Sequence, residues 1–257
     1  MPHIVVQRQG KVGYVVVSNP EKYNAMTVTM WQDATAAIEQ LDADAAITVI
    51  VLSGEGTQAF VSGADISQFE AERGNAQSQQ RYAEIYDAAC QAPVRAVKPV
   101  IASIRGICMG GGLGLAAACD IRLCASDARF RMPAARLGLG YKPQGVERFV
   151  ALLGVQNTLD IFFTARIFGA EEALRMGFVS RVFAPEMLDD AVAEYAALVS
   201  DNAPLTLRAA KLSVNAALGA CHPALADEAA QAANASDDYR EALRAFADKR
   251  KPEFAGR

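Results

Sequence analysis

The sequence predicts an α/β protein that ends in a purely helical region. Apolar segments of strand character alternate with amphipathic helical segments up to about Ala125, and the residues beyond predict mainly helices. A run of three glycines, Gly110 to Gly112, joins a buried strand to a helix of small residues. With 257 residues, 52% of them hydrophobic, the chain is long enough to bury one full core.

The first half of the chain shows the alternation most clearly. Two β-rich segments around Gly10 predict a hairpin, and turn residues and hydrophobic periodicity separate the elements that follow. The expected strands span residues 3–9, 12–18, 47–53, 99–104 and 120–125, and the expected helices span residues 27–41, 75–96 and 113–119.

Beyond residue 125 the patterns predict helices, interrupted by one strand at residues 180–183. The expected helices span residues 144–153, 156–164 and 170–176, and Gly177 takes the place of a C-cap glycine. Pro204 can begin a helix over 205–218, and Ser236 can cap a helix over 239–247. We expect these C-terminal helices to pack on the core or on another subunit.

Composition excludes several classes of function. A net charge of −4 and a pI near 5.3 argue against nucleic acid or an anionic membrane as the main partner. The five cysteines are odd in number and lack Cys-x-x-Cys spacing, and the two histidines are far apart, so neither a disulfide framework nor a metal site is expected. Neither a signal peptide nor a spanning helix is predicted, so we expect a cytoplasmic protein.

Two segments place small residues where backbone N–H groups can approach a ligand. The first segment is Gly110 to Gly112: a strand that ends in glycines and enters a helix exposes unpaired N–H donors at the positive end of that helix. The second segment, Phe60-Val-Ser-Gly-Ala-Asp-Ile66, joins the strand at 47–53 to a following helix. The alternative interpretation of the glycines is close packing of the helix on a strand.

These segments, with Asn24-Ala-Met26, Lys98-Pro-Val-Ile-Ala, Cys119-Asp-Ile-Arg and Ala170 to Gly177, resemble the enoyl-CoA hydratase/isomerase (crotonase) superfamily. The resemblance runs from about Ile4 to the C-terminal tail. It implies an α/β fold, a crotonase-like spiral of ββα units over residues 1–200, and a helical trimerisation region over 201–257. It also implies a homo-oligomer, either a trimer or a dimer of trimers.

The same resemblance implies an acyl-CoA thioester as the substrate and no cofactor beyond its CoA. Two backbone N–H groups would form an oxyanion hole for the enolate, and they map onto Ala64 and Gly111. Further substrate-binding positions are Lys22, Ala25, Asp65, Ile66, Gly114 and Ala134, and Lys249 or Lys251 could neutralise CoA phosphates. We expect Asp65 to brace its loop rather than to take part in chemistry.

The sequence departs from the hydratases of the superfamily at two positions. Those enzymes carry two glutamates that flank the substrate, and here Gly114 and Ala134 stand in their places. Because hydration needs a general acid and a general base, efficient hydratase activity is not expected. Tyr141 and Lys142 are the alternative candidates for catalysis. The two small residues suggest room for a larger or branched acyl group, unless neighbouring side chains fill the space.

Other functions remain open at this point. The chain could be an acyl-CoA decarboxylase or C–C lyase, or a non-catalytic acyl-CoA-binding subunit. A more remote alternative is an NAD-dependent oxidoreductase, because Gly112-Leu-Gly-Leu-Ala-Ala117 matches a variant of the dinucleotide fingerprint. Against it, residues 105–109 separate the expected strand from the glycines.

Overall fold

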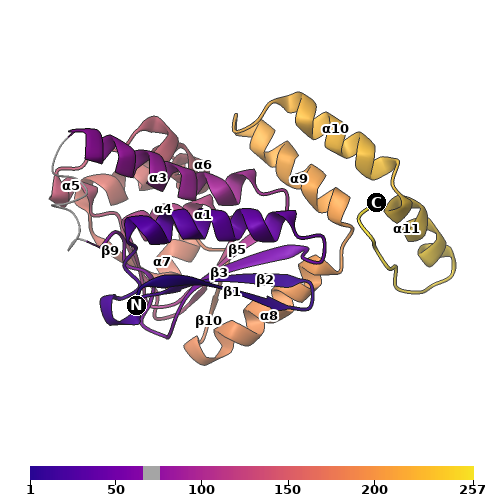
Figure 1. Ribbon diagram of the computed structural model, residues 1–257, viewed down its shortest axis with the longest axis horizontal. Helices are drawn as coiled ribbons and strands as arrows, with labels where there is room; N and C mark the ends of the chain where they lie inside the picture. Colours follow the sequence, from indigo (N-terminus) through magenta and orange to yellow (C-terminus); the bar gives the residue numbers. More distant parts are fainter. Residues whose placement is uncertain (66–75) are drawn as a thin grey trace.

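Two β-sheets and the helices around them form the body of the protein, and a helical arm extends from one side (Figure 1). The computed structural model describes residues 1–65 and 76–257. In the larger sheet the strand order is β1-β2-β3-β5-β7-β10; β1 and β2 are antiparallel and all other neighbours are parallel. Its strands are β1 (His3–Gln9), β2 (Val12–Ser18), β3 (Val49–Gly54), β5 (Val100–Ile104), β7 (Ile121–Ala125) and β10 (Arg181–Phe183).

The smaller sheet consists of strands that the sequence patterns did not predict. Its order is β4-β6-β8-β9, with β4, β6 and β8 parallel and β9 antiparallel to β8. Each strand has three residues, too few for a two-residue alternation to be recognised; they are β4 (Ala59–Val61), β6 (Ile107–Met109), β8 (Arg129–Arg131) and β9 (Ile167–Gly169). The expectation of helices and one strand beyond residue 125 was therefore incomplete.

The chain passes repeatedly from the larger sheet to the smaller one and then into a helix. The order β3-β4-α3, β5-β6-α4 and β7-β8-α5 is the spiral of ββα units that the resemblance implied. The helices of the body are α1 (Val28–Ala43), α3 (Ala76–Arg95), α4 (Gly111–Ala118), α5 (Ala134–Leu137), α6 (Pro143–Thr164), α7 (Ala170–Arg175) and α8 (Leu188–Ser200), with short 3₁₀ turns η1 (Pro20–Lys22) and η3 (Pro185–Met187).

Local signals in the sequence explain several helix ends. Thr27 caps α1 by accepting a hydrogen bond from the Met30 amide at 3.2 Å. Gly154, at φ 72°, divides α6 into the two helices that were predicted there. Gly177, at φ 83°, follows α7 in a conformation that favours glycine.

The central strands of the larger sheet are buried on both faces, which explains their runs of apolar, often β-branched residues. Along β3, Ile50 and Leu52 belong to the main core, whereas Val49 and Val51 pack in a second cluster with α8. Successive side chains of a strand point to opposite faces, so a strand covered on both sides is apolar at every position. Helices α1 and α3 lie over one face and α8 over the other (Figure 1).

A buried arginine fixes the C-terminal end of α4. Arg122, on β7, donates to the carbonyl oxygens of Ala116 at 3.2 Å, Cys119 at 2.6 Å and Phe178 at 2.5 Å. Burial lowers the pKa of the Arg122 guanidinium to about 10, which still leaves it charged at neutral pH. A cation at the C-terminus of a helix stabilises the helix dipole and uses carbonyls that have no helical partner.

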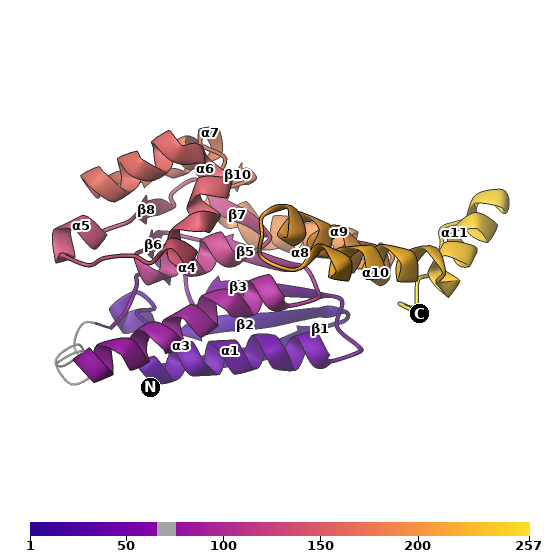
Figure 2. The same cartoon turned by 90° about the horizontal axis from the view of Figure 1, so that it is seen from above.

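The arm consists of α9 (Pro204–Ala217), α10 (Pro223–Asn234) and α11 (Asp237–Ala247) (Figure 2). Helices α9 and α10 pack against each other, and α11 lies at the far end, away from the sheets. Lys211 connects α9 to the body through an ion pair with Asp120 at 2.7 Å. It also donates to the carbonyl oxygens of Pro93 and Lys98. The arm is therefore attached to the ββα body by a buried charge.

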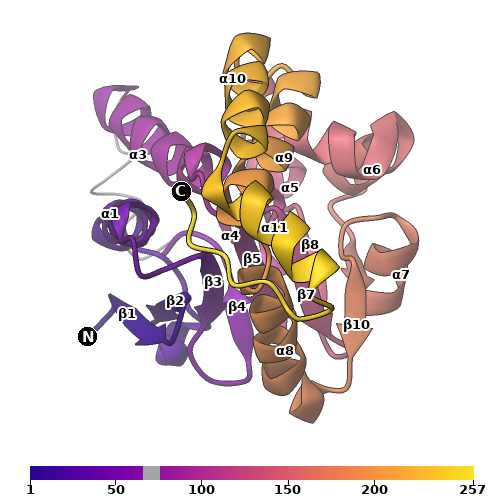
Figure 3. The same ribbon diagram turned by 90° about the vertical axis from the view of Figure 1, so that its right-hand side faces the viewer.

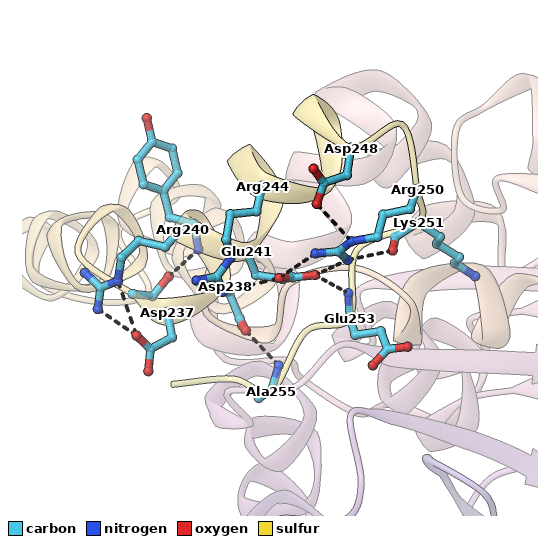
Figure 4. A network of polar contacts seen from close by, with 12 residues as sticks. Asp237, Asp238, Arg240, Glu241, Arg244, Asp248, Arg250, Lys251, Glu253 and Ala255 are labelled. Carbon is cyan, nitrogen blue, oxygen red and sulfur yellow. Dashed lines mark hydrogen bonds and ion pairs between the residues drawn. The ribbon is translucent and has the colours of Figure 1, made fainter.

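The C-terminal tail folds back along α11 (Figures 3 and 4). The buried carboxylate of Asp238 accepts hydrogen bonds from the Ala255 and Gly256 amides at 2.7 and 2.9 Å. Glu241 pairs with Arg250 at 2.5 Å, and this hydrogen bond, with one from the Glu253 amide, lowers the pKa of Glu241 to about 2. Because the pKa of Glu241 is depressed, the Glu241–Arg250 pair contributes its full stability to the fold at pH values above the ordinary pKa of a glutamate. This contribution is lost as the pH falls through about 2.

Large apolar side chains remain exposed on the arm and on the neighbouring part of α6 to α7. Phe246 is 87% and Phe163 74% exposed. The others on these elements are Val150, Val155, Leu159, Ile167, Leu174, Val214, Leu218, Leu225, Tyr239 and Leu243, and Leu198 is exposed on α8. Exposed apolar side chains that lie close together are typical of a face that contacts another protein. Among the residues described, none of the helices is both long and apolar enough to cross a membrane.

Candidate functional site

The amide of Ala64 faces away from the strand pair that holds it. Ala64 forms an isolated parallel bridge with Met26, in which Met26 N–H donates to Gly63 O and Asp65 N–H donates to Met26 O, at 2.8 and 2.9 Å. Successive amides of an extended chain point to opposite sides, so the Ala64 N–H points away from Met26. No described residue accepts a hydrogen bond from it.

The second amide belongs to Gly111, the first residue of α4. Gly110 precedes it at φ 54° and is tied to β8 by a hydrogen bond from its amide to Arg131 O at 3.0 Å. The first amide of α4 with a helical acceptor is that of Gly114, which donates to Gly110 O. No side chain caps the helix, so the N–H groups of its first turn are available to a ligand.

The segments that carry the two amides lie beside each other because β4 approaches the start of α4 very closely. A Cβ placed on Gly112 would lie 2.1 Å from the carbonyl oxygen of Val61, so no side chain fits there. A Cβ on Gly63 would lie 3.9 Å from the Gly111 amide nitrogen. The packing interpretation of the glycines therefore holds for Gly112, and that packing brings Ala64 and Gly111 together.

The space at Gly114 is occupied by a residue that the sequence analysis did not identify. A Cβ on Gly114 would lie 2.0 Å from the hydroxyl oxygen of Tyr86, on α3, and a Cβ on Gly111 would lie 3.2 Å from the Tyr86 ring. The expectation of extra room for the acyl group was therefore wrong on this side. A glycine inside a helix is the signal that could have indicated a close neighbour.

Tyr86 is held in a defined position. Its ring packs edge-to-face on Trp31, with centroids 5.2 Å apart, and its hydroxyl donates to the carbonyl oxygen of Gly111 at 3.5 Å. Burial raises the pKa of Tyr86 well above its usual value and that of Cys90 to about 12. Both groups are therefore neutral at physiological pH, and neither replaces the carboxylate that is missing at Gly114.

The opposite side of the site is also closed by uncharged residues. Pro133 lies 3.6 Å from the Cβ position of Gly110, and Ala134, the first residue of α5, is 5% exposed. Tyr141 is partly buried and its ring packs edge-to-face on Phe162. The side chain of Lys142 is 64% exposed, with its ammonium group 3.8 Å from a carboxylate oxygen of Asp87. Of the two candidates, Tyr141 is therefore partly buried against Phe162, and Lys142 is a largely exposed charge just before α6.

The predicted binding residues near the N-terminus form a brace. Lys22 pairs with the buried carboxylate of Asp65 at 2.8 Å, and this ion pair connects η1 to the segment that carries Ala64. Ala25 is buried between them. Ile66 lies outside the described residues. Lys251 pairs with Asp201 at 2.6 Å, at the base of the arm.

The structure also bears on the nucleotide and metal alternatives. Residues 107–109 form β6, so a strand does lead directly into the glycines, contrary to the argument from residues 105–109. However, the Tyr86 hydroxyl lies 2.0 Å from the Cβ position of Gly114, the second glycine of the match, where the fingerprint requires close approach of a pyrophosphate. Over residues 1–65 and 76–257 no group of His, Cys, Asp and Glu could hold a metal ion.

Comparison with known proteins identifies relatives along the whole chain. The sequence model of the family Enoyl-CoA hydratase/isomerase matches residues 7–257. A short-chain-enoyl-CoA hydratase of Clostridium acetobutylicum is 32% identical over 98% of this chain and 97% of its own. A peroxisomal Delta(3,5)-Delta(2,4)-dienoyl-CoA isomerase of Arabidopsis thaliana is 32% identical over 95% and 92%.

Solved structures agree with this fold. An enoyl-CoA hydratase/carnithine racemase from Magnetospirillum magneticum superposes with a TM-score of 0.93 at 34% identity, over 100% of this chain and 97% of its own. An enoyl-CoA hydratase/isomerase family protein from Hyphomonas neptunium gives a TM-score of 0.95 at 30% identity, over 100% and 98%.

The contact between Gly114 and Tyr86 can be tested by a double-mutant cycle. Alanine is favoured over glycine inside a helix by about 1 kcal/mol, but overpacking costs roughly 1–3 kcal/mol. Gly114→Ala should therefore lower the free energy of unfolding of the native protein. In a Tyr86→Phe background, which lacks the hydroxyl, it should be neutral or stabilising. Urea unfolding measures both, and an equal effect in the two backgrounds would contradict the contact.

Proposed function

The chain belongs to the enoyl-CoA hydratase/isomerase family, and on this premise we propose that it is an acyl-CoA enzyme of the lyase or isomerase type. The thioester oxygen would accept hydrogen bonds from the Ala64 and Gly111 amides. The proposal rests mainly on one observation, the close approach of the segment before Ala64 to the Gly111 amide, whose nitrogen lies 3.9 Å from the Cβ position of Gly63. Neither the Ala64 nor the Gly111 amide has an acceptor in the described part of the chain. The substrate's CoA would be the only cofactor, and the cytoplasm the place of action.

These amides suit the chemistry of a thioester. Reaction at the α-carbon passes through an enolate, whose negative charge lies on the former carbonyl oxygen. Donors aimed at that oxygen, one of them at the positive end of α4, stabilise the enolate relative to the thioester. The Lys22–Asp65 ion pair helps to position the Ala64 segment. We assign Lys22 and Ala25 to the side of the site that receives the adenosine end of CoA.

A decarboxylase or C–C lyase is the second candidate, and the uncharged walls favour it. Gly114 and Ala134 carry no carboxylate, and the phenol of Tyr86 beside Gly114 remains protonated. A decarboxylation breaks the bond between the α-carbon and a carboxylate, releases CO2, leaves the bonding electrons in the enolate and so needs no general base. Tyr141 or Lys142 could then deliver the proton or bind a carboxylate of the substrate.

We expect hydration of crotonyl-CoA to be slow. Without either glutamate, turnover should fall at least about 10²-fold below that of a relative with both, because one general acid or base typically contributes that much. Loss of the enoyl absorbance measures hydration, and a panel of acyl-CoAs, with NAD as a negative control, tests other reactions. Hydration as fast as that of a two-glutamate enzyme would show that other residues of this chain replace the carboxylates missing at Gly114 and Ala134. Thioester binding without any turnover would indicate a non-catalytic subunit.

The oxyanion hole can be tested by removing one donor. Ala64→Pro deletes the N–H group and should lower kcat by about 10²–10³-fold, as loss of one such donor typically does. Ala64→Ser keeps the donor and is the matched control, which should retain most of the activity. Circular dichroism would verify that the proline variant folds. Normal turnover by a folded Ala64→Pro protein would show that this amide is not a donor.

We also propose that the arm assembles the protein into a trimer or a dimer of trimers. The exposed apolar side chains of α6 to α11 support this proposal. In a monomer the aromatic rings of Phe163 and Phe246 would be largely exposed to water, and a contact with another subunit would cover them. Light scattering should give three or six times the mass of 27.3 kDa. Phe246→Asp should shift the protein toward smaller species, whereas the exposed charge change Asp248→Asn should not. A stable monomer at micromolar concentration would refute the proposal.

A further inference from the structure

The space beside the two amides is limited on one side by Tyr86. Its ring lies 3.2 Å from the Cβ position of Gly111 and its hydroxyl oxygen 2.0 Å from that of Gly114. These glycines are three residues apart in α4 and so share one side of the helix. Tyr86 thus extends along the first turn of α4, next to the amide that we assign to the thioester oxygen.

Tyr86 has little freedom to move aside. Its ring packs edge-to-face on Trp31, which is 0% exposed, and its hydroxyl donates to the carbonyl oxygen of Gly111 in α4 at 3.5 Å. Helix α3 itself packs on α1 and α4. To swing Tyr86 out would open a void in the packed core, where lost contacts are not replaced by water.

The acyl group must begin close to this side chain. A thioester oxygen hydrogen-bonded to the Gly111 amide lies about 2.9 Å from its nitrogen. Standard bond lengths then place the α-carbon within roughly 5 Å of that nitrogen. Pro133 also lies close to this turn, 3.6 Å from the Cβ position of Gly110. The first carbons of the acyl group would therefore lie beside the first turn of α4, where Tyr86 and Pro133 are neighbours of Gly111 and Gly110.

We propose that Tyr86 determines acyl-chain length, closing the site so that thioesters of short acyl groups bind and those of long chains are excluded. This inference rests on the proposed acyl-CoA function and deepens it. It reverses the expectation that Gly114 creates space, because the volume freed by the missing glutamate is taken by a tyrosine from a different helix.

Calorimetry with acetyl-CoA, butyryl-CoA and octanoyl-CoA tests the proposal without requiring turnover. The native protein should bind octanoyl-CoA at least 10-fold more weakly than butyryl-CoA. Tyr86→Ala should reduce this ratio to below 3-fold while changing acetyl-CoA binding little. Tyr82→Ala, which removes the same side chain one turn earlier on α3, is the control and should keep the native ratio. Tyr86→Leu removes the ring and hydroxyl but keeps an apolar side chain, and it serves if Tyr86→Ala does not fold.

The outcomes separate the two proposals. Equal affinity of the native protein for butyryl-CoA and octanoyl-CoA would overturn the role of Tyr86, as would an unchanged ratio in a folded Tyr86 variant. Failure to bind any of the three thioesters would instead overturn the acyl-CoA function itself. A ratio that collapses in the Tyr86 variants and persists in Tyr82→Ala supports the proposal.

Discussion

The close approach of β4 to the first turn of α4 is the contact on which the candidate site depends. The backbone carbonyl of Val61, in β4, lies 2.1 Å from the position that a Cβ atom on Gly112 would take, so only glycine fits at this point of α4. This contact sets the spacing of two amides that come from distant parts of the chain. The site is thus built from backbone donors, whose position depends on packing and not on the identity of a reactive side chain.

The contacts around α4 follow from the same constraint. A helix that must lie this close to a strand consists of small residues on that side, and its glycines admit large neighbours on the other. Trp31 and Tyr86 fill that second space. Arg122 holds the opposite end of α4 by its carbonyl oxygens. The eight residues of α4 are therefore fixed along their length, which keeps the amide of Gly111 in place without a capping side chain.

The strands of the larger sheet and the glycine segments could be predicted because both depend on local patterns, whereas the spiral of ββα units was expected only from the resemblance to the superfamily. Periodicity located the strands of the larger sheet, and Thr27, Pro204, Ser236 and Gly177 marked helix ends close to those observed. The strands of the smaller sheet escaped, since three residues carry no periodic signal. Tyr86 escaped for a different reason. Its contact with Gly114 joins residues 28 positions apart, and only the packing of α3 on α4 brings them together.

The burial of Arg122 has a consequence for how the protein responds to ionic strength. Its charge is neutralised by carbonyl dipoles inside the protein, where mobile ions do not penetrate, so salt has little influence on the end of α4 that it holds. The tail is the contrasting case, because Glu241 and Arg250 meet at the surface, where salt screens their attraction. Electrolyte is therefore expected to loosen the periphery of the arm while leaving the C-terminal end of α4 unchanged.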